Sequence, residues 1–392
     1  MQKIRLAIIS CYGLDKGGTE KFLQTVAANL PKDKYDVDYY YIDSNVMRVS
    51  ATKMQYLNDN NVCLIPYQVK DIIAKKRYIM QTESSFFDVY KNNYDLLLTG
   101  SCGYPEEPMT KIRDTPIVQS IHYVSGADNQ YNISRVLHIS EFSKNAWLKK
   151  GGDIKRIEMI SHPIQIPTFH KINMRKQFGI DKDAIVYGLH QRDDDYIFSD
   201  IPLDAYKRIE SEKTAFILCG GSKRYREQAR DLNLLHCYFI PYTDENDVIY
   251  SFLASIDVYA HGRFDGELNS TALAEAMYFG LPIITHPSGL YNGHLEVIRE
   301  NGYVAENSQE YASYMKLFME EEEVREKCSI ESQKVFEANY NLDIQINKIM
   351  NIFEDVLKKP YPNPVRRRYR DSVNRVFNIA KKTLLILSRN LR

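Results

Sequence analysis

IDVYAHGRFDGELNSTALAEAMYFGLPIIT, residues 256–285, is the stretch of sequence that decides the fold. Apolar residues alternate over 256–260, which predicts the end of a short, half-buried strand. Asn269, Ser270 and Thr271 are each suitable N-caps for a helix that runs to about residue 279. The Gly-Leu-Pro sequence that follows stops this helix, and two isoleucines begin the next buried strand. The stretch therefore predicts one βαβ unit.

The loop in front of this helix has the chemistry of a phosphate site. The backbone N–H groups of residues 268–271 have no partner within the helix, and the positive end of the helix dipole lies there. Glu267 and Glu275 flank this position, with seven residues between them. A carboxylate accepts two hydrogen bonds, so Glu275 can hold both hydroxyls of a ribose diol. Glu267 can reach a sugar on the far side of a diphosphate, which suggests a nucleotide-sugar pocket.

These residues resemble the hallmark of retaining GT-B glycosyltransferases of family 4. That hallmark is two glutamates separated by seven residues and followed by an E-A-M-x-x-G-x-P run, which here reads EAMYFGLP over residues 275–282. The resemblance covers residues 1 to about 358. It implies an α/β fold with two Rossmann-like domains that face a central cleft. A C-terminal helix is expected to cross back to the first domain.

The resemblance also implies where the domains divide. We expect an acceptor domain over residues 1–165, to which the crossing helix 340–358 returns, and a nucleotide-sugar domain over residues 170–338. The segment 159–167 holds two prolines in five residues, which disfavour helix and stiffen the crossing between the domains. A basic amphipathic tail over 360–392 is a separate part.

Composition agrees with a soluble globular protein of two domains. The chain has 392 residues, 44% hydrophobic and 26% charged, and its formal net charge is zero. Nothing in this balance points to nucleic acid. The six cysteines are scattered without metal-ligand spacing, so we expect reduced thiols and a cytoplasmic protein. No apolar run is long enough for a transmembrane helix, and the start of the chain has no pattern of a signal peptide.

The first part of the chain reads as strands that alternate with helices. A buried strand over residues 4–10 leads into a glycine-containing loop and a helix that Pro31 ends. Further strands are expected at 37–42, 94–98, 117–121 and 135–140, a helix from Glu141, and one or two helices within 45–93. Gly17 and Gly18 let the backbone approach an anion, although a plain turn explains them equally well. The family has a G-G-x-E run here, which implies a loop that faces the donor diphosphate and the acceptor.

His122 follows the strand 117–121, at an edge where open α/β sheets place their sites. A lone histidine is usually structural. The resemblance places a histidine after this strand in the cleft, near the transferred sugar. The H-D pair that is usual in the family is absent, because Tyr123 follows His122.

Arg192 follows the first strand of the second domain, near residues 184–188. The resemblance implies that its guanidinium grips the donor phosphates. The family's lysine five positions later is missing, since residue 197 is Ile, and three aspartates occupy 193–195. A basic residue elsewhere could substitute, with Lys223, Arg224 and Arg263 as candidates; otherwise the subfamily is divergent or activity is lost. We expect no metal and no other cofactor.

The tail has a charge pattern of its own. Residues 364–392 hold nine Lys or Arg and one Asp, a net charge of 9 − 1 = +8, and their apolar residues fall at helical spacing. This pattern is typical of a helix that lies on an anionic membrane surface. Docking on the protein's own acidic body or on a partner is the alternative. With a membrane contact, the protein is expected on the inner face of the plasma membrane.

The predicted function is retaining transfer of a sugar from a UDP- or GDP-sugar to a saccharide or lipid-linked acceptor, in the synthesis of a surface polysaccharide or glycolipid. Arg192 and the amides of 268–271 would stabilise the leaving diphosphate. Glu275 would hold the ribose, Glu267 would position the sugar, and His122 would contact sugar or acceptor. Two alternatives are a GT-B nucleotide-sugar epimerase and an inactive pseudo-glycosyltransferase that acts as a binding partner.

Overall fold

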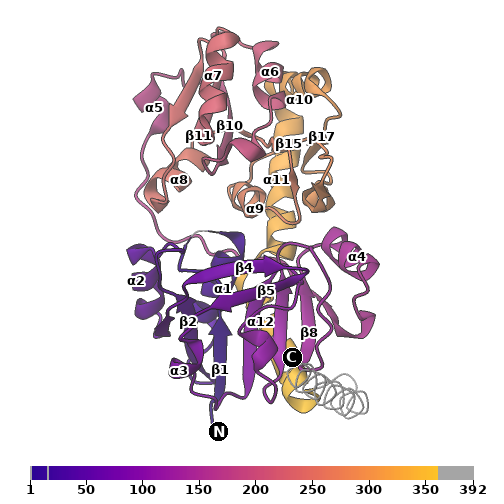
Figure 1. Ribbon diagram of the computed structural model, residues 1–392. Helices are drawn as coiled ribbons and strands as arrows, with labels where there is room; N and C mark the ends of the chain where they lie inside the picture. Colours follow the sequence, from indigo (N-terminus) through magenta and orange to yellow (C-terminus); the bar gives the residue numbers. More distant parts are fainter. Residues whose placement is uncertain (1, 16, 361–392) are drawn as a thin grey trace, which may run out of the picture.

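The computed structural model describes residues 2–15 and 17–360. They form two α/β domains, stacked one above the other in Figure 1, and each is built on a parallel sheet flanked by helices. This arrangement is the predicted fold class. The basic segment 364–392 lies outside the described residues. Within the described residues, every helix is too short or too polar to span a lipid bilayer.

The first sheet has seven parallel strands in the order β3-β2-β1-β6-β7-β8-β9. Their bounds are β1 Ile4–Ile9, β2 Tyr35–Ile42, β3 Cys63–Tyr67, β6 Leu96–Ser101, β7 Ile117–Ile121, β8 Ile133–His138 and β9 Ile157–Met159. The helices of this domain are α1 Gly18–Asn29, α2 Ala51–Asp59, α3 Phe86–Val89 and α4 Glu141–Lys149. The strand order reverses between β1 and β6, so the loops after these strands leave a crevice where such sheets bind ligands.

The second sheet has six parallel strands in the order β12-β11-β10-β13-β15-β17. Their bounds are β10 Ile185–Gln191, β11 Thr214–Gly220, β12 Cys237–Ile240, β13 Val258–Ala260, β15 Ile283–Thr285 and β17 Gly302–Val304. A short parallel pair, β14 Gly266–Glu267 and β16 Tyr291–Asn292, lies outside this sheet. The helices are α5 Met174–Phe178, α6 Ile201–Lys207, α7 Lys223–Asp231, α8 Asn246–Leu253, α9 Thr271–Tyr278, α10 Ser308–Glu320 and α11 Glu322–Asn339. Here the order reverses between β10 and β13.

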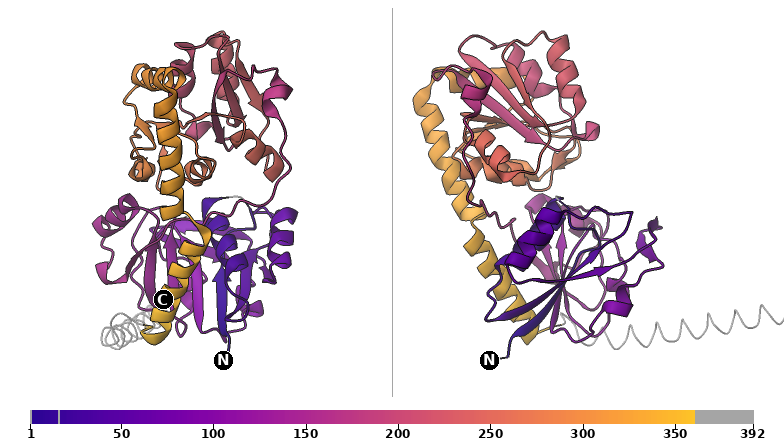
Figure 2. Two further views of the ribbon diagram at one scale, coloured as in Figure 1. Left: turned by 180° about the vertical axis from the view of Figure 1, so that it is seen from behind. Right: turned by 90° about the vertical axis from the view of Figure 1, so that its left-hand side faces the viewer.

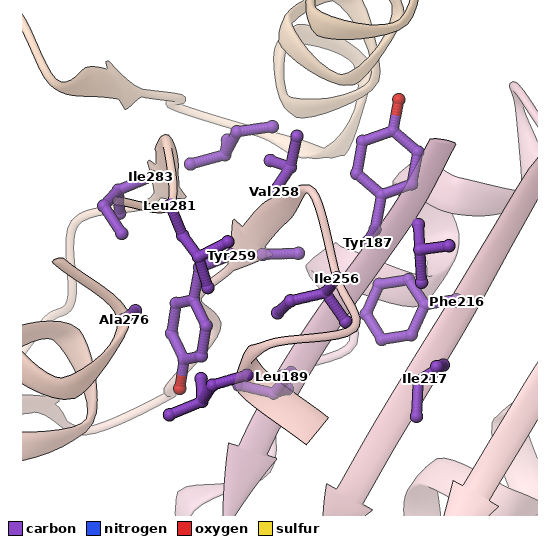
Figure 3. Close-up of a cluster of buried hydrophobic side chains, with 14 of the residues drawn as sticks. Tyr187, Leu189, Phe216, Ile217, Ile256, Val258, Tyr259, Ala276, Leu281 and Ile283 are labelled. Carbon is purple, nitrogen blue, oxygen red and sulfur yellow. The ribbon is translucent and has the colours of Figure 1, made fainter. Parts of the chain in front are cut away.

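The core of the second domain fixes the predicted βαβ unit in place. Val258 and Ile283, from neighbouring strands β13 and β15, are fully buried, and Ala276 of α9 is buried in the same cluster. Figure 3 shows these side chains in the same cluster as Tyr187 of β10 and Phe216 of β11. Helix α9 packs into this core through Leu273, Ala276 and Met277, which places its N-terminus at the carboxyl edge of the sheet.

The last helix returns to the first domain, as predicted. Helix α12, Leu342–Lys358, buries apolar residues at helical spacing against the first sheet, and Ile349, Phe353 and Val356 are fully buried there. Figure 2 shows α11 and α12 running along the back of both domains. The chain therefore crosses between the domains twice, once before α5 and once between α11 and α12.

One region of the first domain differs from the prediction. Residues 45–93 were expected to hold one or two helices; they hold α2 and the four-residue α3, but also β3 and a hairpin of β4 Asp71–Lys75 and β5 Tyr78–Thr82. The hairpin lies on the surface, where most of its side chains are exposed or half-buried. Its pattern of buried positions was therefore too weak to reveal strands.

Candidate functional site

A cleft of about 1180 Å³ lies between the two domains. Nine of the ten predicted site residues line it: Gly17, Gly18, His122, Arg192, Glu267, Leu268, Asn269, Thr271 and Glu275. Ser270, the tenth, does not line the cleft. Its side chain is fully buried and caps α9, with Oγ accepting a hydrogen bond from the Leu273 N–H at 3.1 Å. The prediction offered three N-caps for this helix, and Ser270 is the one used.

The N-terminus of α9 offers several backbone donors to the cleft. The amide N–H groups of Asn269, Thr271 and Ala272 donate no hydrogen bond within the described part of the chain. These residues line the cleft and are half-buried. Together with the positive end of the helix dipole, such amides favour an anion.

Glu275 projects from α9 into the cleft and is already bound by two cationic or polar groups. Lys21 Nζ from the first domain lies 2.5 Å from Glu275 Oε1, and His190 Nε2 lies 3.1 Å from Oε2. Burial alone would raise the pKa of this carboxyl, but Lys21 and then His190 lower it to about 2. Glu275 is therefore an anion at neutral pH, ready to accept hydrogen bonds from hydroxyl groups.

Glu267 is the second carboxylate of the site. Arg263 Nη1 donates to its Oε1 at 2.8 Å. Its Oε2 is buried and accepts no hydrogen bond among the described residues, and His261 Nε2 lies 3.6 Å away. Burial opposes ionisation, but Arg263 and His261 hold the pKa of Glu267 well below its ordinary value. The site therefore keeps an ionised carboxylate with one oxygen available.

The backbone before Glu267 has no room for a side chain. Gly266 has a φ of +64°, and a Cβ placed on it would lie 1.8 Å from the Tyr291 carbonyl oxygen. This close approach pairs β14 with β16 and holds Glu267 in position. Gly266 is thus needed for the geometry of the carboxylate beside it.

Arg192 follows β10, and most of its side chain is exposed. Its guanidinium folds onto Asp194, with Nε and Nη2 at 3.0 and 2.9 Å from Oδ2. Asp194 also accepts from the Tyr196 N–H; this bond and the Arg192 guanidinium lower the pKa of Asp194. Of the three aspartates, Asp194 therefore has a structural role, because it accepts hydrogen bonds from the Tyr196 N–H and from Arg192.

Of the three basic residues suggested as replacements for the missing lysine, Arg263 lines the cleft, whereas Lys223 and Arg224 do not. Arg263 is tied to two carboxylates, since Asp265 accepts from its Nε at 2.7 Å and from its Nη2 at 2.9 Å, and Glu267 accepts from its Nη1. The guanidinium of Arg224 lies over the Phe198 ring at 4.1 Å. Lys21 is a further cation that lines the cleft.

His122 lies on the first-domain wall of the cleft, buried between Phe22 and His162. Its Nε2 bonds Ser120 Oγ at 2.8 Å, and its Nδ1 has no partner among the described residues. Burial, and then His162, holds the pKa of His122 well below its ordinary value, so the ring is neutral at neutral pH. A neutral imidazole can donate or accept one hydrogen bond without adding charge.

Polar contacts between the domains define this cleft. Asn269 Nδ2 donates to the Ile139 carbonyl at 2.9 Å. Glu296 accepts from the N–H groups of Glu141 and Phe142 at 2.8 and 2.6 Å, and so binds the N-terminus of α4. Together with the Lys21–Glu275 pair, these contacts hold the first domain against the loop that carries the candidate site.

The cleft residues that were not recognised from the sequence include Lys21, His162, His190 and His261. Two of them had a usable signal. His190 is near the end of β10, two residues before Arg192, and His261 follows β13, so both histidines lie at the carboxyl edge of the sheet. His162 lies in the segment that crosses between the domains, where nothing local indicates a site. Lys21 meets Glu275 only through the tertiary fold.

The described residues contain no group of three His, Cys, Asp or Glu side chains placed to hold a metal ion. All six cysteines are free thiols, in agreement with the sequence.

Comparisons with known proteins relate this architecture to glycosyltransferases. Residues 171–335 match the family model described as glycosyl transferases group 1. No curated protein is similar to the chain in sequence. Among solved structures, Anabaena Alr3699/HepE in complex with UDP-glucose has a TM-score of 0.69 and 17% identity, and the match covers 89% of this chain and 99% of that one.

Two further structures are similar at low identity. A glycosyltransferase from Rickettsia africae has a TM-score of 0.71 and 14% identity, over 92% of this chain and all of that one. The sucrose-phosphate synthase of Thermosynechococcus elongatus has a TM-score of 0.69 and 14% identity, over 91% of this chain and all of that one. The fold is GT-B. With a group 1 domain over its second half, the chain is a glycosyltransferase.

Proposed function

We propose that this glycosyltransferase moves a sugar from a UDP- or GDP-sugar to a saccharide or lipid-linked acceptor, with retention at the anomeric carbon. One observation carries the donor assignment. Two ionised carboxylates, the half-buried Glu267 and the buried Glu275, lie on either side of the unpartnered amides that begin α9, inside the cleft between the domains. The group 1 domain and the HepE complex with UDP-glucose support a nucleotide-sugar donor.

The donor would lie with its diphosphate against the start of α9. Negative charge grows on the diphosphate as the glycosidic bond breaks. The amides of Asn269, Thr271 and Ala272 and the helix dipole would stabilise that charge without moving. Arg192 is exposed and held by a single carboxylate, so it is able to turn towards the phosphates. The ribose diol would bind Glu275.

The sugar would lie between Glu267 and His122. Oε2 of Glu267 and Nδ1 of His122 have no hydrogen-bond partner among the described residues and are buried in the wall of the cleft, so each side chain would turn slightly towards the cleft to bond a sugar hydroxyl. Neither needs to act as a nucleophile. Following the family that the sequence resembles, we propose front-face attack, in which the leaving phosphate takes the acceptor proton. Enclosure in the cleft would limit donor hydrolysis.

A screen of UDP- and GDP-sugars with membrane extract as the source of acceptor tests this function. We expect free nucleoside diphosphate together with a glycosylated product, identified by mass, and the same anomeric configuration in donor and product. An epimerised donor would indicate the epimerase, and binding without turnover would indicate the inactive homologue. An inverted product would contradict retention.

Glu275→Ala is the matched test of the site. Because two hydrogen bonds to a charged group are lost, kcat/KM for the donor should fall roughly 100-fold or more. Glu212→Ala removes a glutamate whose side chain is 93% exposed, and it should leave kcat/KM unchanged. An equal kcat/KM for Glu275→Ala and the unchanged protein would show that Glu275 does not bind the donor.

We also propose that the basic segment 364–392 attaches the enzyme to an anionic membrane on the cytoplasmic side, where a role in surface polysaccharide or glycolipid synthesis would place it. The charge and spacing of the segment support this attachment. Deletion of 364–392 should release the protein from vesicles that contain phosphatidylglycerol. Equal sedimentation with and without the segment would contradict it.

A further inference from the structure

A second hollow, of about 540 Å³, lies wholly on the first domain. Its walls come from three separate places in the chain. Arg77 belongs to the turn of the β4–β5 hairpin, Lys149 and Lys150 end α4, and the loops at Tyr104 and at Ser125–Ala127 complete it. In Figure 1 the hairpin crosses the front of the first domain, and α4 lies to its right. A hollow of this size holds a small ligand group.

The hollow is strongly cationic. Three of its lining residues are Arg77, Lys149 and Lys150, and no carboxylate lines it. None of these three cations forms a salt bridge with a carboxylate of the described residues. In addition, the amides of Gly126 and Ala127 donate no hydrogen bond within those residues. Unpaired cations beside free amides suit a phosphate.

The hairpin places its basic residues at a structural cost. Lys75 pairs with Tyr78, so Lys76 and Arg77 form a two-residue turn, with φ of +46° and +67°. Such a type I′ turn favours Asn-Gly, because residues with a Cβ are strained there. The helix dipole can explain lysines at the end of α4. It does not explain two cations in a strained turn, and strain of this kind clusters where it serves binding.

The walls are fixed to one another by hydrogen bonds. Ile79 of β5 exchanges backbone bonds with Pro105 and Glu107, at 3.0 and 2.9 Å. Asn129 Nδ2 donates to the Gly151 carbonyl at 2.8 Å, which ties the loop after β7 to the end of α4. The backbone segments that carry the three cations are therefore held around one hollow by the fold, while the cationic side chains themselves are exposed.

The hollow lies next to the cleft. Tyr123 lines the cleft and Ser125 lines the hollow, so their Cα atoms are at most about 7 Å apart along the chain. A molecule with a saccharide in the cleft can extend a charged group into the hollow. We propose that this hollow binds a phosphate group of the acceptor, a site that rests on the proposed transfer reaction and adds an anionic acceptor to it.

Lys76→Asn/Arg77→Gly is the decisive variant, because it removes both charges and supplies the residues that the turn favours. We expect its Tm to rise by about 2 °C or more, so failure to fold is not a competing explanation. Pyrophosphate, titrated by calorimetry into the full chain with UDP present in excess, should bind the variant about tenfold more weakly than the unchanged protein. Lys149→Ala/Lys150→Ala should show the same loss from the opposite wall.

A charge-matched control is Lys213→Ala/Lys348→Ala, which removes two exposed lysines that line neither pocket. It should bind pyrophosphate like the unchanged protein. A higher Tm with unchanged pyrophosphate binding in Lys76→Asn/Arg77→Gly would overturn the proposal. The proposal would also be overturned if this variant kept its pyrophosphate binding but no longer bound vesicles with roughly one third phosphatidylglycerol. The hairpin would then contact a lipid surface.

The kinetic readout separates this site from the donor site. In the transfer assay the hairpin variant should raise KM for the acceptor and leave KM for the donor unchanged, whereas Glu275→Ala acts on the donor. If neither protein transfers sugar but the hairpin variant binds pyrophosphate more weakly than the unchanged protein, the phosphate site is supported and the proposed function is contradicted. If transfer occurs and the variant has an unchanged acceptor KM, the phosphate site fails alone.

Discussion

Glu275 carries a negative charge in the interior of the cleft, and the side chains around it balance that charge. Lys21 belongs to the other domain, and the pair is mostly buried, with side chains 28% and 7% exposed. Removal of one partner leaves a buried charge uncompensated, which costs more than loss of a surface pair. The Lys21–Glu275 pair, which belongs to the candidate donor site, should therefore contribute to the stability of the folded protein.

A double-mutant cycle on Lys21→Ala and Glu275→Ala should give a coupling free energy of about 2 kcal/mol in urea unfolding. The exposed pair Lys70–Glu83, with side chains 62% and 70% exposed, is the control and should give less than about 1 kcal/mol. Equal coupling in the two pairs would mean that Lys21 is only a surface contact.

Arg192→Ala tests the proposed phosphate contact. KM for the donor should rise about tenfold, because a charge-assisted hydrogen bond is lost. Stability should change little, since the Arg192 side chain is 56% exposed in its pair with Asp194. Arg226→Ala, whose guanidinium lies over the Phe239 ring away from the cleft, serves as the control. A donor KM that is equal in both variants would contradict the role of Arg192.

At the residue scale, sequence alone indicated the carboxylates but not their partners. Glu267 and Glu275 stand in a local pattern that a reader of the chain can recognise, and both line the cleft. Lys21 lies 254 residues from Glu275, and no spacing joins them. Contacts between distant parts of a chain depend on the packing of the domains, and local sequence patterns do not predict that packing.

Helix α9 is the element on which the site depends, and Ser270 fixes its first turn. Ser270→Ala should destabilise the protein by about 1 kcal/mol, because the Leu273 N–H loses its cap. It should also raise KM for the donor, since the amides that would meet the diphosphate belong to the same turn. Urea unfolding and donor kinetics check the two parts.

Asn307→Ala is a control for this helix, because Asn307 caps α10 away from the cleft, accepting from the N–H groups of Gln309 and Glu310 at 3.0 Å each. It should cost similar stability and leave donor KM unchanged. Equal changes of KM in the two variants would show that α9 has no special place in donor binding.

Elements with a strong pattern were predictable, and exposed elements were not. The strand Ile117–Ile121 is buried throughout and was predicted with the bounds that the structure has. The strands β4 and β5 have few buried positions, so nothing in their sequence separates them from loop or helix. The turn of this hairpin carries Arg77, one of the three cations that line the second hollow, so the hollow was not foreseen.

Burial lowers the pKa of five histidines of the described residues, and this makes the stability of the protein depend on pH. His138, His162 and His261 have their pKa lowered from 6.5 to about 4, the pKa of His122 lies well below 6.5, and the pKa of His286 is also lowered. The unfolded chain binds protons at these groups below about pH 6.5, whereas the folded chain does not. Stability is therefore present above pH 6.5 and is lost as the pH falls towards 4.

Each such histidine should lower the free energy of unfolding by about 1.4 kcal/mol per pH unit within this window. Glu106 acts in the opposite direction, because burial and then Asp128 raise its pKa to about 8 and the folded chain keeps its proton. The net slope is therefore less steep than that of the histidines alone. Urea unfolding at several pH values checks this, and stability that stays flat or rises on acidification would contradict it.

At the scale of the molecule, the two-domain architecture and the returning helix were predicted from the resemblance to GT-B glycosyltransferases. The relative position of the domains did not, because it is set by a few polar contacts, such as Glu296 with the N-terminus of α4. The cleft arises from that position, and its chemistry is the sum of side chains that the two domains contribute separately.

A crystal structure of the protein with its nucleotide-sugar donor, or with UDP, tests the central claim most directly. The diphosphate should lie within hydrogen-bond distance of the amides at residues 269–272, with the ribose hydroxyls on Glu275 and the Arg192 side chain turned from Asp194 to a phosphate. A nucleotide bound elsewhere, with the start of α9 unchanged, would contradict the account.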